Sequence, residues 1–214
     1  MSQLRITEIF HSLQGEARTV GLPTVFVRLT GCPLRCQYCD TAYAFSGGEM
    51  IEQDAILAQV AQYGAKYVTV TGGEPLAQPG CKALLSALAD EGYEVSLETS
   101  GALDIAGLDP RISVVMDLKT PDSGEMSRNL LSNVDHLKPL DQVKFVICSR
   151  ADYQWAKMQM DQFQLNDKVD EVLFSPSHHQ VKPSDLADWI VADKLNVRFQ
   201  VQLHKLLWND EPGR

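Results

Sequence analysis

The feature that most constrains the fold of this sequence is a series of short apolar, β-branched runs with helical patterns between them. Between several runs, apolar residues recur at helical spacing, as at Ile56, Val60 and Tyr63. This alternation predicts βα units around a parallel sheet of six or seven strands. The runs lie at residues 24–30, 67–70, 94–98, 112–116, 143–148, 171–174 and 197–201.

Two gaps between these runs hold no convincing helix. Residues 101–111 are only marginally helical, and residues 120–139 are polar. An open doubly wound sheet and a partial barrel therefore both fit the pattern. No GxGxxG motif follows the first run, so a dinucleotide-binding fold has no positive support. In both architectures ligands bind at the carboxyl ends of the strands.

Unusual polar and glycine-rich segments gather just after the predicted strands. Because the carboxyl ends of parallel strands meet at one rim, we expect six strands to contribute to one site. The last strand, 197–201, is expected to run straight into residues 202–205, so that His204 lies on a terminal strand. The segments are 31–41, 71–75, 99–101, 117–119, 175–178 and 202–205.

Three cysteines in one rim segment form a CxxxCxxC array. Cys32, Cys36 and Cys39 lie within eight residues, and the glycine and proline among them help the loop to curl around a metal centre. A structural zinc would need a fourth ligand, for which Asp40 is the only adjacent candidate. Three cysteines suit a four-iron cluster in which one iron stays open to an external ligand.

Other uses of the cysteines remain open at this point. They include structural zinc, a thioredoxin-like redox pair of Cys36 and Cys39, and incidental buried thiols. The more distant Cys81 and Cys148 are expected to be buried apolar thiols. Five cysteines are an odd number, which disfavours a disulfide framework.

Charge and hydropathy exclude several classes of partner. The chain carries 28 acidic and 19 basic residues, for a net charge of −9, and this disfavours broad binding to nucleic acid. No apolar run approaches the ~18 residues that a membrane helix needs, and no signal peptide is visible. We therefore expect a cytoplasmic protein that binds a small molecule or another protein.

The cysteine array followed by Gly-Gly-Glu-Pro at 72–75 resembles the radical S-adenosylmethionine (SAM) superfamily. The resemblance implies that Cys32, Cys36 and Cys39 hold a 4Fe-4S cluster whose open iron binds SAM. It also implies a set of cofactor-binding residues on the rim. They are Tyr38, Cys39, Asp40, Gly73, Glu74, Ser100, Asp117, Leu118, Lys119, Ser175, Pro176, Ser177 and His178.

Segments at 10–16, 98–101, 117–119 and 202–205 narrow the resemblance to the 7-carboxy-7-deazaguanine synthase family. Motifs match over roughly residues 6–205. The family's fold is a shortened, partial TIM-like barrel with fewer helices than strands, which implies a single radical SAM core domain over residues 1–214. The implied reaction is the ring contraction of 6-carboxy-5,6,7,8-tetrahydropterin to 7-carboxy-7-deazaguanine with loss of ammonia, in queuosine and deazapurine biosynthesis.

The resemblance also implies a pterin site and a magnesium ion. Gln14 and Glu16 are expected to satisfy the guanine-like edge of the pterin, and Arg28 is expected to pair with its carboxylate. Thr41 is expected to offer a hard oxygen to Mg²⁺. The implied substrate-binding residues are Leu13, Gln14, Gly15, Glu16, Arg28, Thr71 and His204.

Two rival classes and two departures qualify this resemblance. A glycyl-radical activating enzyme shares the cluster motif, and a zinc-bearing scaffold would have no catalysis at all. Ala17 stands where relatives often have glycine, and residues 206–214 extend past the point where some relatives end. We therefore carry over no role for a terminal carboxylate. An electron donor such as flavodoxin and a homodimer are also implied, and Trp208 is expected to pack over the pocket or in a dimer interface.

Overall fold

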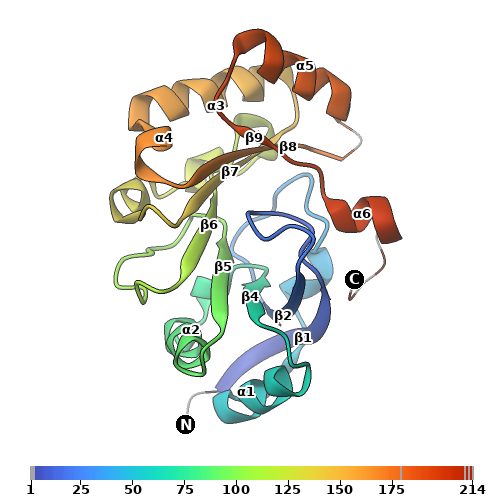
Figure 1. Ribbon diagram of the computed structural model, residues 1–214, viewed down its shortest axis with the longest axis vertical. Coiled ribbons are helices and arrows are strands. Elements are labelled where there is room, and N and C mark those ends of the chain that lie inside the picture. Colours follow the sequence, from blue (N-terminus) through green and yellow to red (C-terminus); the bar gives the residue numbers. More distant parts are fainter. Residues whose placement is uncertain (1–2, 179, 210, 212, 214) are drawn as a thin grey trace.

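The computed structural model describes residues 3–178, 180–209, 211 and 213. Within this part of the chain, one nine-stranded sheet has the order β3-β1-β2-β4-β5-β6-β7-β8-β9 and curves into a partial barrel (Figure 1). From β2 through β4 to β9 neighbouring strands are parallel, whereas β1 pairs antiparallel with β2 and β3. The strands are β1 (Gln3–Leu13), β2 (Pro23–Leu29), β3 (Glu49–Glu52), β4 (Tyr67–Gly72), β5 (Glu94–Thr99), β6 (Ser113–Asp117), β7 (Gln142–Ile147), β8 (Glu171–Pro176) and β9 (Arg198–Phe199).

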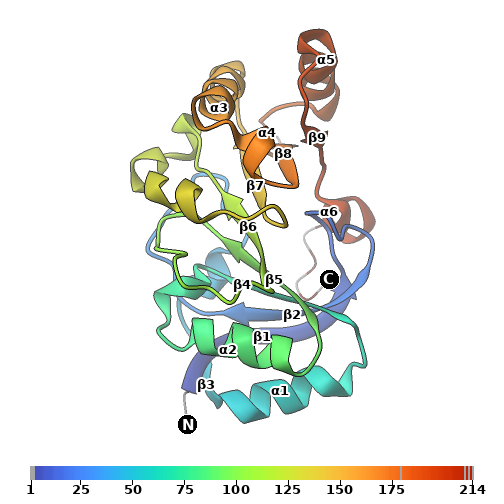
Figure 2. The same cartoon turned by 60° about the vertical axis from the view of Figure 1, so that its left-hand side comes forward.

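Helices cover the sheet at its two ends (Figure 2). Apolar residues of α1 and α2 pack with β1, β2, β4 and β5, and those of α3 and α5 pack with β6 to β8. The helices are α1 (Gln53–Gln62), α2 (Cys81–Asp90), α3 (Arg150–Phe163), α4 (Leu165–Lys168), α5 (Pro183–Asp193) and α6 (Leu203–Trp208). The predicted α/β architecture, with fewer helices than strands, is confirmed.

The two gaps without a predicted helix contain no α-helix among the described residues. Between β6 and β7 the chain forms only short 3-10 turns at Pro121–Ser123, Met126–Arg128 and Leu131–His136. The buried side chain of Asn133 satisfies backbone groups that a helix would otherwise pair. Its amide donates to the carbonyls of Gly101 and Leu103 and accepts from the N–H of Ile105.

The sheet differs from the sequence prediction at both of its edges. Strands β1 and β3 lie outside the predicted runs, because β1 has irregular burial and β3 is short and contains no buried residue. The predicted strand 197–201 is wrong beyond Phe199, and His204 lies on helix α6 rather than on a strand. Within the described part of the chain, β9 is an edge strand that pairs with β8 alone, so little holds these residues in the sheet.

The loop between β1 and β2 crosses the open side of the barrel (Figure 1). Gln200 is buried and binds both backbone groups of Ala17, at 2.7 Å and 2.9 Å. Gln142 of β7 accepts from the N–H of Arg18 at 2.7 Å. The loop is therefore attached to the far half of the sheet, which places its first residues inside the barrel.

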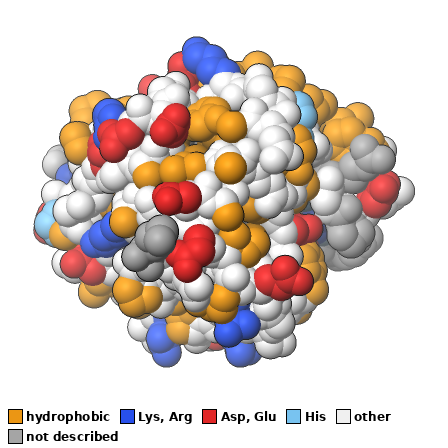
Figure 3. All heavy atoms as spheres, turned by 90° about the horizontal axis from the view of Figure 1, so that it is seen from below, with side chains coloured by type: hydrophobic (Ala, Val, Ile, Leu, Met, Phe, Trp, Pro, Cys, Tyr) orange, Lys and Arg blue, Asp and Glu red, His pale blue; other side chains and the backbone are white. Residues whose placement is uncertain are grey.

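The outer surface around α1 and α2 mixes apolar and charged side chains when seen from below (Figure 3). None of the described helices has the length and apolar character required to cross a membrane. Cys81 and Cys148 are buried free thiols, as predicted.

Candidate active site

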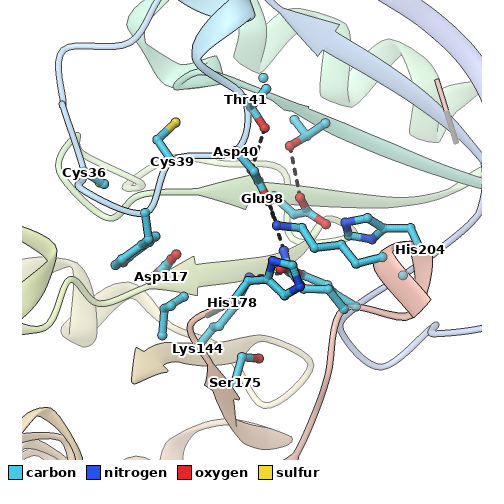
Figure 4. Close-up of a pocket in the computed structure, with 18 of the residues that line it drawn as sticks. Cys36, Cys39, Asp40, Thr41, Glu98, Asp117, Lys144, Ser175, His178 and His204 are labelled. Atoms are coloured by element: carbon cyan, nitrogen blue, oxygen red, sulfur yellow. Dashed lines mark hydrogen bonds and ion pairs between the residues drawn. The ribbon is translucent and has the colours of Figure 1, made fainter. Parts of the chain in front are cut away.

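A cavity of about 810 Å³ opens where the carboxyl ends of the parallel strands meet. Its wall combines the loop after β2, the β1–β2 loop, the ends of β4 to β8 and helix α6 (Figure 4). All but two of the residues predicted to bind the cofactors, the substrate or a metal line it. They are Leu13, Gln14, Gly15, Glu16, Arg28, Cys32, Cys36, Tyr38, Cys39, Asp40, Thr41, Thr71, Gly73, Ser100, Asp117, Lys119, Ser175, Pro176, Ser177, His178 and His204.

The three cysteines of the rim loop are half-buried free thiols that line this cavity. Burial raises the pKa of Cys32, and it raises the pKa of Cys36 to about 11. Among the described residues, no three His, Cys, Asp or Glu side chains converge on a position for a single metal ion. In an iron–sulfur cluster each cysteine binds a different iron, and three thiols on one curled loop fit that donor set.

The cysteine loop rests on the Gly-Gly-Glu-Pro turn. The backbone N–H of Glu74 donates to the carbonyl of Gly31 at 2.8 Å. A Cβ at Gly73 would lie 2.3 Å from Gly31 O and 2.7 Å from the Cβ of Cys32. Only glycine therefore allows this close approach of two backbones beside the first cysteine.

Two residues predicted to bind the cofactor do not line the cavity. The Glu74 carboxylate is buried and accepts from the hydroxyl of Thr99, the backbone N–H and hydroxyl of Ser100, and the N–H of Leu76. Leu118 packs in the apolar core. The Glu74 side chain thus joins the ends of β4 and β5, while neighbouring Gly73 and Ser100 face the cavity.

Three buried polar atoms of the cavity wall lack a hydrogen-bond partner within the described chain. They are the Tyr38 hydroxyl, one carboxylate oxygen of Asp117 and the Ser175 hydroxyl. The other oxygen of Asp117 binds Lys119 Nζ at 2.8 Å. Because unpaired buried polar groups are costly, this wall fits a polar ligand that pairs with them.

A second set of polar groups lies across the cavity, around Glu98. Its two oxygens accept from Gln14 Nε2 at 3.3 Å and from the Thr71 hydroxyl at 3.0 Å. Burial, reinforced by the charge of Glu16, raises the pKa of Glu98. Burial also acts on Glu16, but an ion pair with Lys144 outweighs it and lowers the pKa of Glu16.

Arg28 lies near the end of β2 with its guanidinium held from one side. Its Nε donates to Glu8 Oε1 at 2.7 Å, and the Tyr43 hydroxyl donates to the same oxygen at 2.8 Å. The guanidinium carbon lies 5.8 Å from the ring centres of Phe10 and Tyr43. The Glu8 contact uses Nε, and the terminal Nη groups are the part of the fork that can pair with a ligand carboxylate.

Asp40 connects the cysteine loop to the C-terminal helix. Gln202 donates to Asp40 Oδ2 at 3.1 Å, and Lys205 forms an ion pair with the same oxygen at 3.1 Å. The Thr41 hydroxyl donates to the other oxygen at 2.9 Å. Burial acts to raise the pKa of Asp40, but Lys205 and these hydrogen bonds hold it well below its usual range.

Helix α6 also contacts the β1–β2 loop. The N–H of Leu203 donates to the carbonyl of Gly15 at 3.0 Å. A Cβ at Gly15 would lie 2.2 Å from Nδ1 of His204, so the imidazole packs directly on this backbone. Burial lowers the pKa of His204, which keeps the ring neutral at neutral pH.

The sequence analysis gave no role to several residues of the wall. Lys144 is the most consequential, because it is the only lysine of β7 and lies between apolar residues of that strand. The alternation along β7 places Val143 and Phe145 in the core, so Lys144 had to point to the opposite face. That alternation was the available signal for a lysine inside the barrel.

The fold and this cavity define a radical SAM enzyme, and the comparisons with known proteins agree. Residues 26–123 match the family model of the Radical SAM superfamily. The crystal structure of QueE from Escherichia coli has the same fold, with a TM-score of 0.77, 24% sequence identity and coverage of 94% of this chain and 95% of that one.

Two curated relatives give the particular family. The chain is 41% identical to the 7-carboxy-7-deazaguanine synthase of Koribacter versatilis, with 97% of this chain and 98% of the relative covered. It is 43% identical to that of Chlorobaculum tepidum, with 97% and 96% covered. The chain belongs to the 7-carboxy-7-deazaguanine synthase family.

Proposed function

We propose that this protein catalyses the radical ring contraction of 6-carboxy-5,6,7,8-tetrahydropterin to 7-carboxy-7-deazaguanine with loss of ammonia. The observation that carries the proposal is the composition of one cavity. Three thiols and unpaired polar atoms line one wall, and Glu16, Glu98 and Arg28 line another. Residues 1–214 act as one radical SAM core domain in this proposal.

Cys32, Cys36 and Cys39 would hold the 4Fe-4S cluster, and the unpaired atoms of Tyr38 and Ser175 fit the polar groups of SAM. When bound, the cluster and SAM supply the radical chemistry that removes a hydrogen atom from the substrate carbon bearing the carboxylate. The protein's own task is to place that carbon and to exclude water. The further SAM-binding residues in this proposal are Asp40, Gly73, Ser100, Asp117, Lys119, Pro176, Ser177 and His178.

The pterin would lie against Gln14, Glu16 and the backbone of Leu13 and Gly15. A pterin edge both donates and accepts hydrogen bonds, and carboxylate, amide and backbone groups together satisfy both roles. Thr71 and His204 close the same side of the cavity. At the other end of the ring, the fork of Arg28 would pair with the carboxylate and fix which carbon faces the cysteine loop.

Magnesium is a separate part of the proposal. Thr41 offers a hydroxyl oxygen on the cavity wall, and such a hard oxygen suits Mg²⁺, which keeps several waters and binds substrate carboxylates. We expect Thr41→Ala to lower turnover by roughly 10- to 100-fold and to weaken its dependence on magnesium. An unchanged magnesium response in the variant would contradict this role.

Anaerobic reconstitution and turnover test the function. The protein should bind about four irons per chain, and replacing all three cysteines of the rim loop with alanine should abolish iron binding. With SAM and a reductant, the reconstituted protein should convert the pterin to the deazaguanine. Stoichiometric zinc without iron uptake, or an iron-loaded protein inert toward the pterin, would overturn the proposal. We also propose a flavodoxin as the reductant, and cross-linking checks this contact. A homodimeric assembly is the last part of the proposal, and light scattering checks it.

A further inference from the structure

Lys144 lies on β7 and lines the cavity on the side of the β1–β2 loop (Figure 4). Its Nζ forms an ion pair with Glu16 Oε2, and both side chains are largely buried, at 13% and 12% exposure. Asp117 lies beside it in register on β6, and its charge and that of Glu98 also act on the lysine. Several acidic side chains thus act on the charge of Lys144, and Glu16 is the one that forms an ion pair with it.

The two carboxylates nearest the pterin site differ in their bonding. Glu98 uses both oxygens to accept from Gln14 and Thr71. Glu16 receives the ammonium of Lys144 at one oxygen, and each carboxylate oxygen has two lone pairs. Both carboxylates keep lone pairs for a ligand, but Glu16 is the one of the two that a cation contacts, and Lys144 fixes the plane of its carboxylate.

The hydrogen-bond donors of the proposed ligand explain why Glu16 would need Lys144 beside it. A 2-amino-4-oxopyrimidine presents a ring N–H and an exocyclic N–H side by side, and an ionised carboxylate accepts both in parallel. A protonated carboxyl would offer its own O–H to a donor edge and lose one of these bonds. Buried next to a second carboxylate, Glu16 needs a cation in contact in order to remain ionised.

We propose that Lys144 is a positioning residue that sets specificity for the 2-amino-4-oxo edge, by holding Glu16 as a fixed, ionised acceptor for two adjacent N–H donors. The inference rests on the proposed function, because it names the part of the pterin that Glu16 reads. Burial alone would raise the pKa of Glu16 and favour its neutral form. The pKa is instead lowered, because the charge and hydrogen bond of Lys144 outweigh the effect of burial. Lys144 itself touches Glu16 rather than the reacting atoms.

The test compares two ligands on the iron-loaded protein, under anaerobic conditions, by titration calorimetry. One ligand is 6-carboxytetrahydropterin. The other is its 2-oxo counterpart, 6-carboxytetrahydrolumazine, which replaces the amino donor with an acceptor. For Lys144→Met we expect pterin affinity to fall about 10- to 100-fold, with a much smaller change for the lumazine. The ratio of the two affinities should therefore collapse, while iron content and SAM binding stay at wild-type levels.

Rescue and background variants separate this role from a structural one. Lys144→Arg keeps a cation beside Glu16, so it should retain much of the wild-type ratio of pterin affinity to lumazine affinity. Glu16→Gln should lose the ratio on its own, and Lys144→Met added to Glu16→Gln should change it no further. Lys144→Arg and Glu16→Gln carry opposite predictions, a retained ratio and a lost ratio, so the inference remains testable if Lys144→Met does not fold.

Lys138→Met is the matched control. Lys138 pairs with the buried Asp141 at 3.0 Å and does not line the cavity, so the ratio should keep its wild-type value. Equal losses for both ligands in Lys144→Met, or a preserved ratio in Glu16→Gln, would overturn the inference. Failure of the wild-type protein to bind the pterin would instead overturn the proposed function, so the two failures are distinct.

Discussion

At the scale of single residues, burial in the cavity changes the pKa of a carboxyl group and so its contribution to stability. Glu98 is a carboxyl between β-strands, and its pKa is raised by burial and by Glu16. Such a group stabilises the folded protein most below its unfolded pKa, near 4.5. That contribution is lost as the pH rises through the higher folded pKa.

Glu98→Gln should therefore stabilise the protein at pH 8 and damage its function. The amide keeps the shape and removes the buried charge, so we expect Tm to rise by about 2–4 °C for each ~1 kcal/mol gained. The gain should shrink as the pH is lowered from 8, because the wild-type carboxyl regains its proton as the pH falls through its raised pKa. Thermal unfolding over a series of pH values, with pterin affinity measured alongside, checks this. A gain that did not vary with pH would contradict the titration of Glu98.

Arg28→Lys tests the carboxylate clamp. Lysine has no Nε to bind Glu8 while a planar fork binds a ligand, so pterin binding should weaken by about 2–4 kcal/mol. Iron content and uncoupled cleavage of SAM should survive. Arg18→Lys is the control, since the Arg18 side chain pairs with Asp170 at an exposed site, where changes stay within about 0.5 kcal/mol. If Arg28→Lys loses its iron as well as pterin binding, Arg28 has a structural role and does not act as the carboxylate clamp.

Motif residues were predictable from the sequence at this scale, and bonding partners were not. The cysteines, Gly73 and Arg28 stand in motifs or just after a strand, so their place on the rim followed from spacing. Glu74 stands in the same motif, yet its carboxylate binds Thr99 and Ser100 from the next strand. Which side chain a buried carboxylate meets depends on strand order, and local sequence does not carry strand order.

At the scale of elements, the position of helix α6 in the cavity wall depends on its contact with the backbone of the β1–β2 loop. It meets the β1–β2 loop at Gly15 and the cysteine loop at Asp40. Residues 202–205 were predicted on the rim, but as the continuation of a strand and not as part of a helix. Short edge elements are fixed by tertiary contacts such as these, and their own propensities are weak guides.

Gly15→Ala should displace α6. The new Cβ would lie 2.2 Å from His204 Nδ1, so the imidazole must move out of the cavity. We expect faster hydrogen exchange in residues 203–208 and a loss of pterin binding, with iron content unchanged. Gly80→Ala is the control, because its Cβ would meet only Leu4 side-chain atoms, at 3.4 Å and beyond. Unchanged hydrogen exchange in α6 would show that the His204 side chain can move aside without destabilising the helix.

At the scale of the whole molecule, the parallel sheet was predictable and its closure was not. The apolar runs predicted the parallel strands because strands of a parallel sheet are usually buried on both faces, as β4 and β8 are. The antiparallel edge of β1 and β3 shows no such run. The contacts that close the barrel are made by glutamines, whose roles depend on residues more than a hundred positions away.

Gln200→Ala tests that closure. The change leaves the N–H and carbonyl of Ala17 without their partner, and each buried unpaired group costs about 1–3 kcal/mol. The urea midpoint should fall, and residues 14–22 should exchange faster than the sheet. Gln162→Ala on the exposed face of α3 should shift stability by no more than about 0.5 kcal/mol. Equal stability of the two variants would mean that the loop is held by other contacts.

The position of α6 in the chain has a consequence for how the protein is made. The cavity wall joins residues of the β1–β2 loop to residues 202–205, so the ribosome must synthesise about two hundred residues before the wall is complete. Because synthesis runs from the N-terminus, residues 31–41 leave the ribosome long before residues 202–205, which complete the wall. A growing chain can present its thiols to the machinery that delivers iron while the pterin site is still unfinished. Assembly of the reactive centre is thereby ordered in time by the linear order of the chain.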